Sequence, residues 1–173
     1  MIVLIGESGS GKSTVERKLV EKGFKRAISH TTRPIRVNER DGVDYFFVSR
    51  DEIVRMKSEG RFAEYIPYLD NIYALSVEEC VDDRVVVVEP TGLAQLQEKD
   101  YLNLFIVYLY TSESVREARM TKRGDRREDI QTRIEKDREV FAGISESASV
   151  VLDAENLSID TLADEIIRLY NAR

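Results

Sequence analysis

The chain has 173 residues, of which 34% are charged and 42% hydrophobic, and its formal net charge is −6. This length suits one domain with a sizeable core, and the acidic balance argues against a general binder of nucleic acid or anionic membranes. The lone Cys80 excludes a disulfide framework within the chain, and no apolar stretch is long enough to cross a bilayer. We therefore expect a cytoplasmic protein, monomer or homodimer, whose partners are small molecules and neither nucleic acid nor membrane.

A glycine-rich loop follows the first predicted strand, residues 2–5. Residues 6–13 read GESGSGKS, the spacing of a phosphate-binding P-loop, and a helix is expected over 12–22. Glycines let backbone N–H groups approach phosphate oxygens, and the helix N-terminus adds a favourable dipole. Lys12 is expected to reach the β- and γ-phosphates and Ser13 to coordinate Mg²⁺. The motif therefore predicts ATP and Mg²⁺ as cofactors, with the phosphates held by Gly6, Ser8, Gly9, Ser10, Gly11, Lys12, Ser13 and Thr14.

The elements after this motif alternate between strands and helices. Up to residue 81 we expect strands at 24–29 and 45–48, a helix at 50–58 capped by Ser49, a hairpin of 62–68 and 72–75 around Asp70 and Asn71, and a short helix at 77–81. After it we expect strands at 85–88, 104–109 and 149–152 and helices at 91–98, 112–123, 128–141 and 158–170. Continuous apolar strands separated by helices predict an α/β fold with a central parallel sheet flanked by helices, carrying a mixed insert near 33–80.

Residues 29–47 hold a second motif. Two arginines three residues apart, Arg33 and Arg36, and the following Tyr45 offer a cationic clamp and a phenolic donor, which suit a monophosphate. The stretch resembles the signature of the guanylate kinases, with Thr31-Thr32-Arg33, Arg36, Glu39, Gly42, Tyr45 and Phe47 at that family's spacing. The resemblance implies a P-loop kinase fold in one domain, with a core of residues 1–32, 81–118 and 134–173, an inserted mixed NMP-binding subdomain at 33–80 and a mobile lid at 119–133.

The resemblance also implies roles in binding an acceptor nucleotide. Glu64 stands where the family places the carboxylate that accepts from guanine N1–H and the exocyclic amine, a pair of donors that adenine lacks. Ser29 would face the same base, and Glu89, in place of the family's Asp, would lie near the guanine amine or the water molecules of Mg²⁺. The full set implied for the acceptor is Ser29, Arg33, Arg36, Tyr45, Glu64, Tyr73 and Glu89.

Arginines crowd the predicted lid of this otherwise acidic chain. Phosphoryl transfer needs positioning and positive charge around the transferred group more than it needs covalent help from the protein. By resemblance, the catalytic arginines are Arg119, Arg123 and Arg133, acting with Lys12. The turn at Gly124 looks slightly shorter than in the family, so Arg126 or Arg127 could take over a contact from Arg123.

Two departures from the family pattern concern the acceptor. Leu75 replaces a hydroxyl that completes recognition of the guanine edge, so this role is weakened, moved to Ser76, or replaced. Pro90 follows Glu89 in Val88-Glu89-Pro90-Thr91-Gly92, which changes the surroundings of the acidic residue.

The sequence favours ATP-dependent phosphorylation of a nucleoside monophosphate, GMP or dGMP, to the diphosphate. One alternative is a kinase of the same fold with another acceptor base or a phosphorylated small molecule. A non-catalytic guanylate-kinase-like interaction module is disfavoured by the intact Lys12-Ser13, and a P-loop ATPase without an acceptor is disfavoured by the acceptor clamp.

Overall fold

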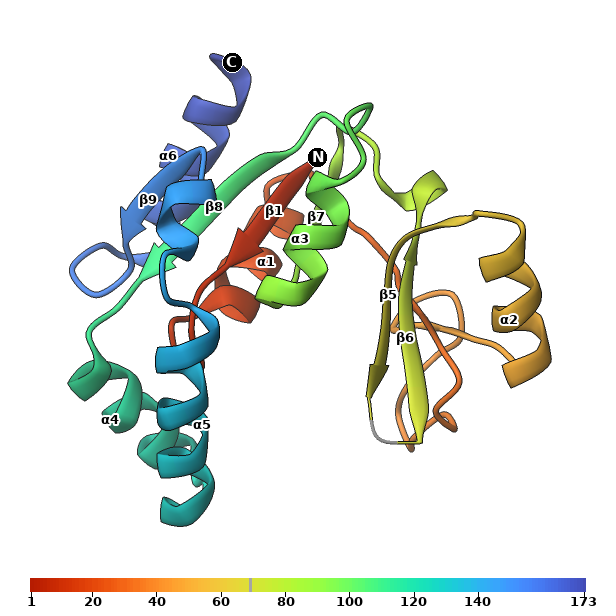
Figure 1. Ribbon diagram of the computed structural model, residues 1–173. Helices are drawn as coiled ribbons and strands as arrows, with labels where there is room; N and C mark the ends of the chain where they lie inside the picture. Colours follow the sequence, from red (N-terminus) through yellow and green to blue (C-terminus); the bar gives the residue numbers. More distant parts are fainter. Residues whose placement is uncertain (69) are drawn as a thin grey trace.

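A five-stranded parallel sheet forms the centre of the protein (Figure 1). The computed structural model describes residues 1–68 and 70–173. The sheet has the order β2-β7-β1-β8-β9, with every neighbouring pair parallel. Its strands are β1 (Ile2–Ile5), β2 (Lys25–Arg26), β7 (Arg84–Val87), β8 (Phe105–Tyr110) and β9 (Val150–Asp153). The predicted α/β fold class with a central parallel sheet is thereby confirmed.

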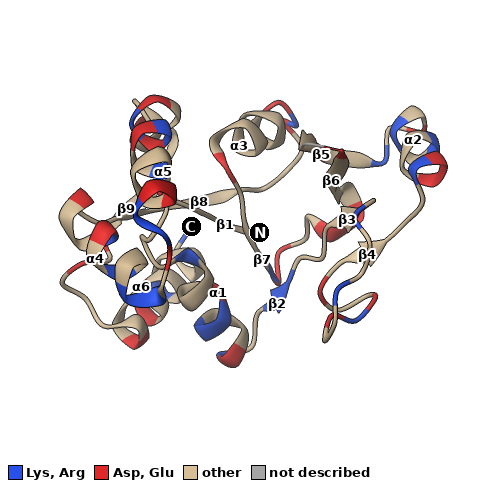
Figure 2. Ribbon diagram, turned by 90° about the horizontal axis from the view of Figure 1, so that it is seen from below, with Lys and Arg blue, Asp and Glu red and all other residues tan. Residues whose placement is uncertain are grey.

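Helices cover both faces of this sheet, which is why all four residues of β1 are buried. On one face lie α1 (Lys12–Glu21) and α6 (Ile159–Asn171), which pack Leu19, Leu162 and Ile166 against Ile2 and Leu4. On the other face lies α3 (Pro90–Gln97), whose buried Leu93 and Leu96 join the cluster around Val3 and Ile5. Figure 2 shows α3 and α5 on one side of the sheet and α1 and α6 on the other.

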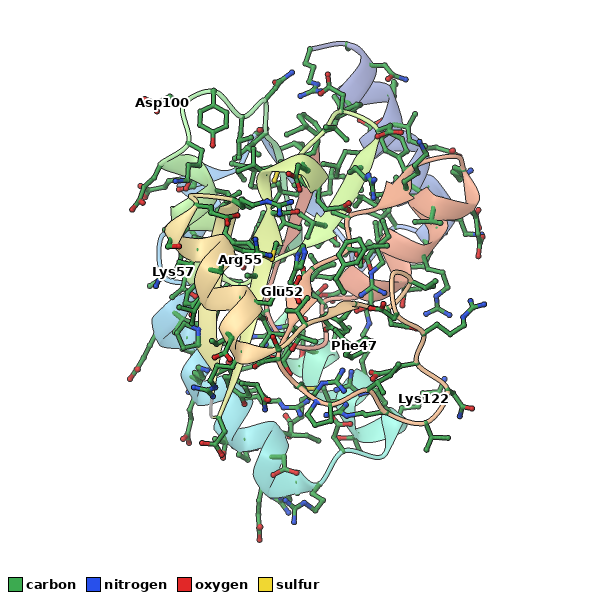
Figure 3. The ribbon with its side chains drawn as sticks, turned by 90° about the vertical axis from the view of Figure 1, so that its right-hand side faces the viewer. Phe47, Glu52, Arg55, Lys57, Asp100 and Lys122 are labelled. Atoms are coloured by element: carbon green, nitrogen blue, oxygen red, sulfur yellow. The ribbon has the colours of Figure 1, made fainter. Side chains whose placement is uncertain are left out.

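A second, four-stranded sheet of order β4-β3-β6-β5 stands beside the first. Its strands are β3 (His30–Thr31), β4 (Phe46–Phe47), β5 (Phe62–Tyr68) and β6 (Asn71–Ser76). The helix α2 (Arg50–Ser58) covers one face through Ile53 and Met56, and the Ser49 hydroxyl caps it by accepting from the N–H of Glu52 at 3.1 Å. Figure 3 looks onto α2, with Glu52, Arg55 and Lys57 on its exposed side. On the opposite face of this sheet, Leu75 is buried in the cluster around Val3 and Ile5.

Of the strand predicted at 24–29, only Lys25–Arg26 forms a strand (β2), and the next strand, β3, begins at His30 in the other sheet. Up to Ala27, whose N–H bonds to the carbonyl of Val85, the chain follows β7. The N–H of Ile28 turns away and donates to the buried Glu79 carboxylate at 2.8 Å, and His30 begins the second sheet. The prediction of one strand was wrong because the hydrophobic pattern carries no mark of a change of sheet. His30 also precedes residue 33, where the predicted subdomain begins.

The return passage between the sheets runs through the same carboxylate. The short helix predicted at 77–81 is a single 3₁₀ turn, Val77–Glu79, between β6 and β7. Glu79 accepts from Arg84 Nη1 at 2.7 Å as well as from Ile28. Both segments that join the two sheets are therefore bonded to one side chain.

Two further helices follow the carboxyl end of β8. They are α4 (Glu113–Arg123), which ends at Gly124 with a φ of 92°, and α5 (Arg127–Val140). Met120, Ile130 and Ile134 form a small buried cluster between them. A second 3₁₀ turn, Ile144–Ser147, leads into β9. Within the described residues, no helix is long and apolar enough to cross a membrane.

Candidate functional site

The P-loop connects β1 to α1 at the carboxyl edge of the parallel sheet. Gly9 and Gly11 have φ angles of 83° and 101°, which only glycine adopts without strain. Gly11 is also the residue preceding α1, and no side chain caps this helix end. The first N–H groups of α1 are therefore left for an anion, as the sequence predicts for a phosphate.

Lys12 lies folded back along its own loop. Its ammonium group donates to the carbonyl oxygens of Gly6 and, at 3.2 Å, Glu7. Burial lowers the pKa of Lys12, while the Glu89 carboxylate acts in the opposite direction. The lysine is thus held beside the P-loop by weakly basic carbonyls, which an anionic phosphate can replace.

One cavity joins the P-loop to the predicted lid arginines. It has a volume of about 400 Å³, and its P-loop side is formed by Ser8, Gly9, Gly11, Lys12, Ser13 and Thr14. Its other side is formed by α4 and α5 through Arg119, Met120, Arg123 and Arg133. Gly6 and Ser10 do not line it, and Ser10 is buried beneath the loop. The structure therefore brings together most of the residues predicted for the donor nucleotide.

The three predicted catalytic arginines are held in two different ways. Arg119 Nη1 donates to the P-loop carbonyl of Ser10 at 3.2 Å, and its Nη2 donates to Ala154 at 2.7 Å. Arg123 and Arg133 are half-exposed and both bond to Asp125, Arg133 at 3.0 Å. Arg119 is therefore a fixed part of the loop's surroundings, whereas Asp125 gathers the other two cations at the cavity.

The arginines at the start of α5 point elsewhere. Arg126 is exposed and bonds to Asp129 at 2.9 Å. Neither Arg126 nor Arg127 lines the cavity. The arrangement gives no support to the idea that one of them replaces Arg123.

The donor set suits a magnesium ion that is bound mainly through phosphate. No group of three or more His, Cys, Asp or Glu side chains that would hold a metal occurs in residues 1–68 and 70–173. Ser13 supplies one hydroxyl oxygen at the cavity wall. Mg²⁺ usually keeps several water molecules and binds the phosphates of its substrate, so the Ser13 hydroxyl fits the ligand position that the sequence predicts for it.

The predicted acceptor residues form a first group around Arg33. This buried guanidinium makes two bonds to Glu39, at 2.8 and 2.9 Å, and lies 5.4 Å from the centre of the Tyr45 ring. Tyr73 approaches Tyr45 with ring centres 5.8 Å apart. Arg36 is exposed, and its backbone N–H donates to Glu39 at 2.8 Å. Glu39 therefore fixes the guanidinium of Arg33 and the backbone of Arg36, with the rings of Tyr45 and Tyr73 close by.

A second group lies where β5 meets α3. Glu64 and Leu75 are opposite each other on neighbouring strands, as are Ile66 and Tyr73, so Glu64 and Tyr73 share one face of the sheet. That face is opposite α2, because Tyr65 and Ala74 pack with the helix. Leu75 is fully buried. The structure thus places an apolar side chain, without a hydroxyl, next to Glu64.

The Glu64 carboxylate packs against the first turn of α3. A Cβ atom on Gly92 would lie 2.0 Å from Glu64 Oε1, so any larger residue there would displace the carboxylate. Burial raises the pKa of Glu64 to about 7, with a smaller contribution from the negative charge of Glu89. Glu89 precedes α3 at the carboxyl end of β7 and is exposed. Ser29 lies in the passage between the sheets, where its carbonyl accepts from Phe46 at 3.0 Å.

Sequence reasoning missed two carboxylates that bond to residues lining the donor cavity, Asp125 and Asp137. Asp125 bonds to Arg123 and Arg133, and Asp137 accepts from the N–H of Ser8 at 2.8 Å. A signal for Asp137 was present, because the buried positions of α5 are 130, 134 and 137. This is the spacing of one helical face, so an acid at 137 is predicted to be buried and to need a partner.

The chain is similar to known guanylate kinases in sequence and in fold. The chain is 34% identical to the guanylate kinase of Streptococcus mutans, covering 90% of this chain and 79% of that protein. It is also 34% identical to the guanylate kinase of Streptococcus thermophilus, covering 99% and 86%. A crystal structure of guanylate kinase from Anaplasma phagocytophilum superposes with a TM-score of 0.70 at 24% identity, covering 99% of this chain and 84% of that chain.

A more distant fold neighbour is a gluconokinase from Sinorhizobium meliloti, with a TM-score of 0.52 at 23% identity, covering 99% of this chain and 93% of that one. The family model named guanylate kinase matches residues 1–169. With a family match over nearly the whole chain, and with relatives 34% identical over at least 90% of it, the protein belongs to the guanylate kinase family.

Proposed function

We propose that this protein transfers the γ-phosphoryl group of ATP to GMP or dGMP, yielding two nucleoside diphosphates. The observation that carries the proposal is the cavity in which the P-loop faces Arg119, Arg123 and Arg133. Three cations opposite an anion-binding helix end suit a triphosphate. They can stabilise the negative charge that is spread over the oxygens of the transferred phosphoryl group in the transition state. Membership of the guanylate kinase family supports the choice of reaction.

The donor side requires no general base. An acceptor phosphate is already an anionic nucleophile, so the protein needs to align it and to stabilise charge. Lys12 and the lid arginines are the groups we assign to this stabilisation. Bound through Ser13, Mg²⁺ would neutralise charge on the donor phosphates.

The acceptor side supplies a phosphate clamp and a base-reading carboxylate on one sheet. The Arg33 guanidinium lies beside the Tyr45 ring, and the Tyr45 ring lies beside that of Tyr73. This cation and these two phenols suit a monophosphate. We assign Glu64 as the hydrogen-bond acceptor for guanine N1–H and the 2-amino group, since an ionised carboxylate can accept from both donors. By the resemblance to the family, we assign Arg36 to the same phosphate and Ser29 and Glu89 to the surroundings of the base.

The direct test is ADP formation from ATP and Mg²⁺ with GMP, dGMP, AMP, CMP, UMP and dTMP in parallel and with no acceptor. We expect turnover only with GMP and dGMP. Because Leu75 replaces a hydroxyl beside Glu64, turnover with a different acceptor would keep the kinase and reject the base assignment. Turnover without any acceptor would instead indicate an ATPase, and no turnover at all would favour an interaction module.

The raised pKa of Glu64 predicts a pH dependence of acceptor binding. Since only the ionised carboxylate accepts two N–H groups, kcat/KM for GMP should fall about tenfold per pH unit below pH 7. The acceptor phosphate also titrates near pH 6. Because the side chain of Glu64→Gln does not titrate, the profile of this variant shows the contribution of the phosphate alone. The measurement is kcat/KM for GMP between pH 5.5 and 8.5 in both proteins; parallel profiles would contradict the assignment of Glu64.

The Glu64 carboxyl group also affects the free energy of unfolding, which changes with pH in the direction opposite to acceptor binding. Its pKa is about 7 in the folded chain against an ordinary value of 4.5, so the folded state binds the extra proton between these values. The free energy of unfolding contributed by Glu64 therefore decreases as pH rises from about 4.5 to about 7. Urea unfolding of wild type and Glu64→Gln over this range should converge at low pH.

A further inference from the structure

A buried ion pair joins α4 to α5 beside the P-loop. Arg116 on α4 and Asp137 on α5 are 4% and 6% exposed, with Nη1 and Oδ2 3.4 Å apart. Figure 1 shows α4 and α5 side by side at the end of the molecule where the P-loop lies. Neither residue lines the donor cavity. Their role is therefore not direct contact with a nucleotide.

Both members of the pair are bonded to the same P-loop residue. The N–H of Ser8 donates to Asp137 Oδ2 at 2.8 Å, and Arg116 Nη1 donates to the carbonyl of Ser8 at 3.3 Å. The next residue, Gly9, is packed against α4 so closely that a Cβ atom would lie 2.9 Å from the carbonyl oxygen of Arg116. The loop is thus fixed to α4 and α5 through its backbone at Ser8 and Gly9.

Helix packing alone gives no reason for a buried charge pair here. The contact between α4 and α5 already contains the apolar cluster of Met120, Ile130 and Ile134. Burying two charges is costly, and an apolar pair of similar size is often as stable. An apolar pair would offer no hydrogen-bond acceptor to the N–H of Ser8 and no donor to its carbonyl. Both backbone groups are partly buried and therefore need partners.

We infer that Arg116 and Asp137 are positioning residues that hold the P-loop at Ser8 in the arrangement that binds the donor triphosphate. They also tie that arrangement to the helices bearing Arg119, Arg123 and Arg133. A shift of α5 against α4 changes the hydrogen bonds of Ser8 and moves the lid arginines together. The inference rests on the proposed function only in taking the donor as ATP.

The charges of Arg116 and Asp137 cancel each other close to the proposed phosphate site. Asp137 and Arg116 both lie close enough to Lys12 to shift its pKa, in opposite directions. Removing Arg116 alone leaves an uncompensated carboxylate next to the anion site, and removing Asp137 alone leaves Ser8 without its acceptor. Each single substitution is therefore expected to weaken nucleotide binding.

A second ion pair between the same helices provides a matched control. Arg138 on α5 bonds to Glu113 on α4 at 2.9 and 2.6 Å, and the two side chains are 62% and 41% exposed. Within the described residues, no hydrogen bond or ion pair joins either side chain to the P-loop. Glu113→Gln thus breaks a contact between α4 and α5 and leaves Ser8 as it is.

The test is calorimetric binding of ADP with Mg²⁺ to purified wild type, Asp137→Ala, Arg116→Met and Glu113→Gln, followed by KM for ATP and for GMP. Loss of a charge-assisted bond to the loop should weaken ADP binding about 10- to 100-fold in the first two variants. KM for ATP should rise with it, KM for GMP should change less than twofold, and Glu113→Gln should match wild type. Unchanged ADP affinity in Asp137→Ala and Arg116→Met would overturn the inference.

Two further variants separate positioning from a structural role. Arg116→Lys keeps the charge but not the fork, so ADP affinity between those of wild type and Arg116→Met is expected. Arg116→Leu with Asp137→Ala removes both charges, and it should recover thermal stability but not ADP affinity. Recovery of both would show a merely structural pair. A wild-type protein that binds ADP but phosphorylates no monophosphate would refute the proposed function and not this inference.

Discussion

Replacing Lys12 by alanine is expected to reduce phosphoryl transfer to GMP by about 10³-fold or more. The ammonium group of Lys12 is the one P-loop cation in the donor cavity, and the carbonyls of Gly6 and Glu7 hold it beside the site of the anion. The loss should appear mainly in kcat, because the charge on the leaving phosphates grows in the transition state. The measurement is steady-state ADP formation at saturating ATP and GMP.

Lys18 on the same helix is the matched control. It is paired with Glu21 and Asp160 on the side of α1 away from the loop. Lys18→Ala should therefore keep wild-type rates within about twofold, as surface pairs contribute little. A Lys12→Ala protein with nearly normal kcat would remove the P-loop from the mechanism.

Replacing Arg33 by alanine should have the second largest effect, on the acceptor. We expect KM for GMP to rise and kcat to fall, with kcat/KM about 10²-fold lower or more. Arg33 is the buried centre of the residues that we assign to the acceptor phosphate. It makes two hydrogen bonds to Glu39 and lies near the rings of Tyr45 and Phe47. Arg33→Lys retains the charge but not the planar fork, so an intermediate loss is expected. KM for ATP should stay close to wild type.

Arg61 offers a comparison on the same sheet. It pairs with the exposed Glu78 at 2.9 Å, away from the Arg33 group. Arg61→Ala should leave the kinetics of GMP unchanged. If Arg33→Ala altered KM for ATP and not KM for GMP, the clamp would have to be reassigned to the donor.

Local patterns were enough to predict most elements of the fold. The run Ile2–Ile5, the glycine spacing of the P-loop and the capping residue Ser49 each depend on neighbours within a few residues, and the structure has these elements at or within a residue of the predicted bounds. Helix α2 matches its predicted range, 50–58, at both ends. Short-range physical chemistry determines such features, so one sequence suffices.

Features that depend on distant partners were not predictable in the same way. After β2 ends at Arg26, the N–H of Ile28 bonds to Glu79, 51 residues away, and the chain passes to the other sheet. The bond from Ser8 to Asp137 joins residues 129 positions apart. The spacing of residues 130, 134 and 137 marks the buried face of α5, but it does not identify Ser8 as the partner of Asp137. The acceptor and lid assignments likewise came from resemblance and remain to be tested by the substitutions above.

The bonds of Glu79 have a consequence for the energetics of acceptor binding. Both connections between the sheets meet at this carboxylate, so it stabilises the relative orientation of the sheets seen here. A ligand that must touch both sheets selects from the population of orientations. Its apparent dissociation constant is the intrinsic one divided by the fraction of molecules already competent. We therefore expect a substitution of Glu79 to raise the apparent dissociation constant of the acceptor, although Glu79 is not among the residues assigned to bind it.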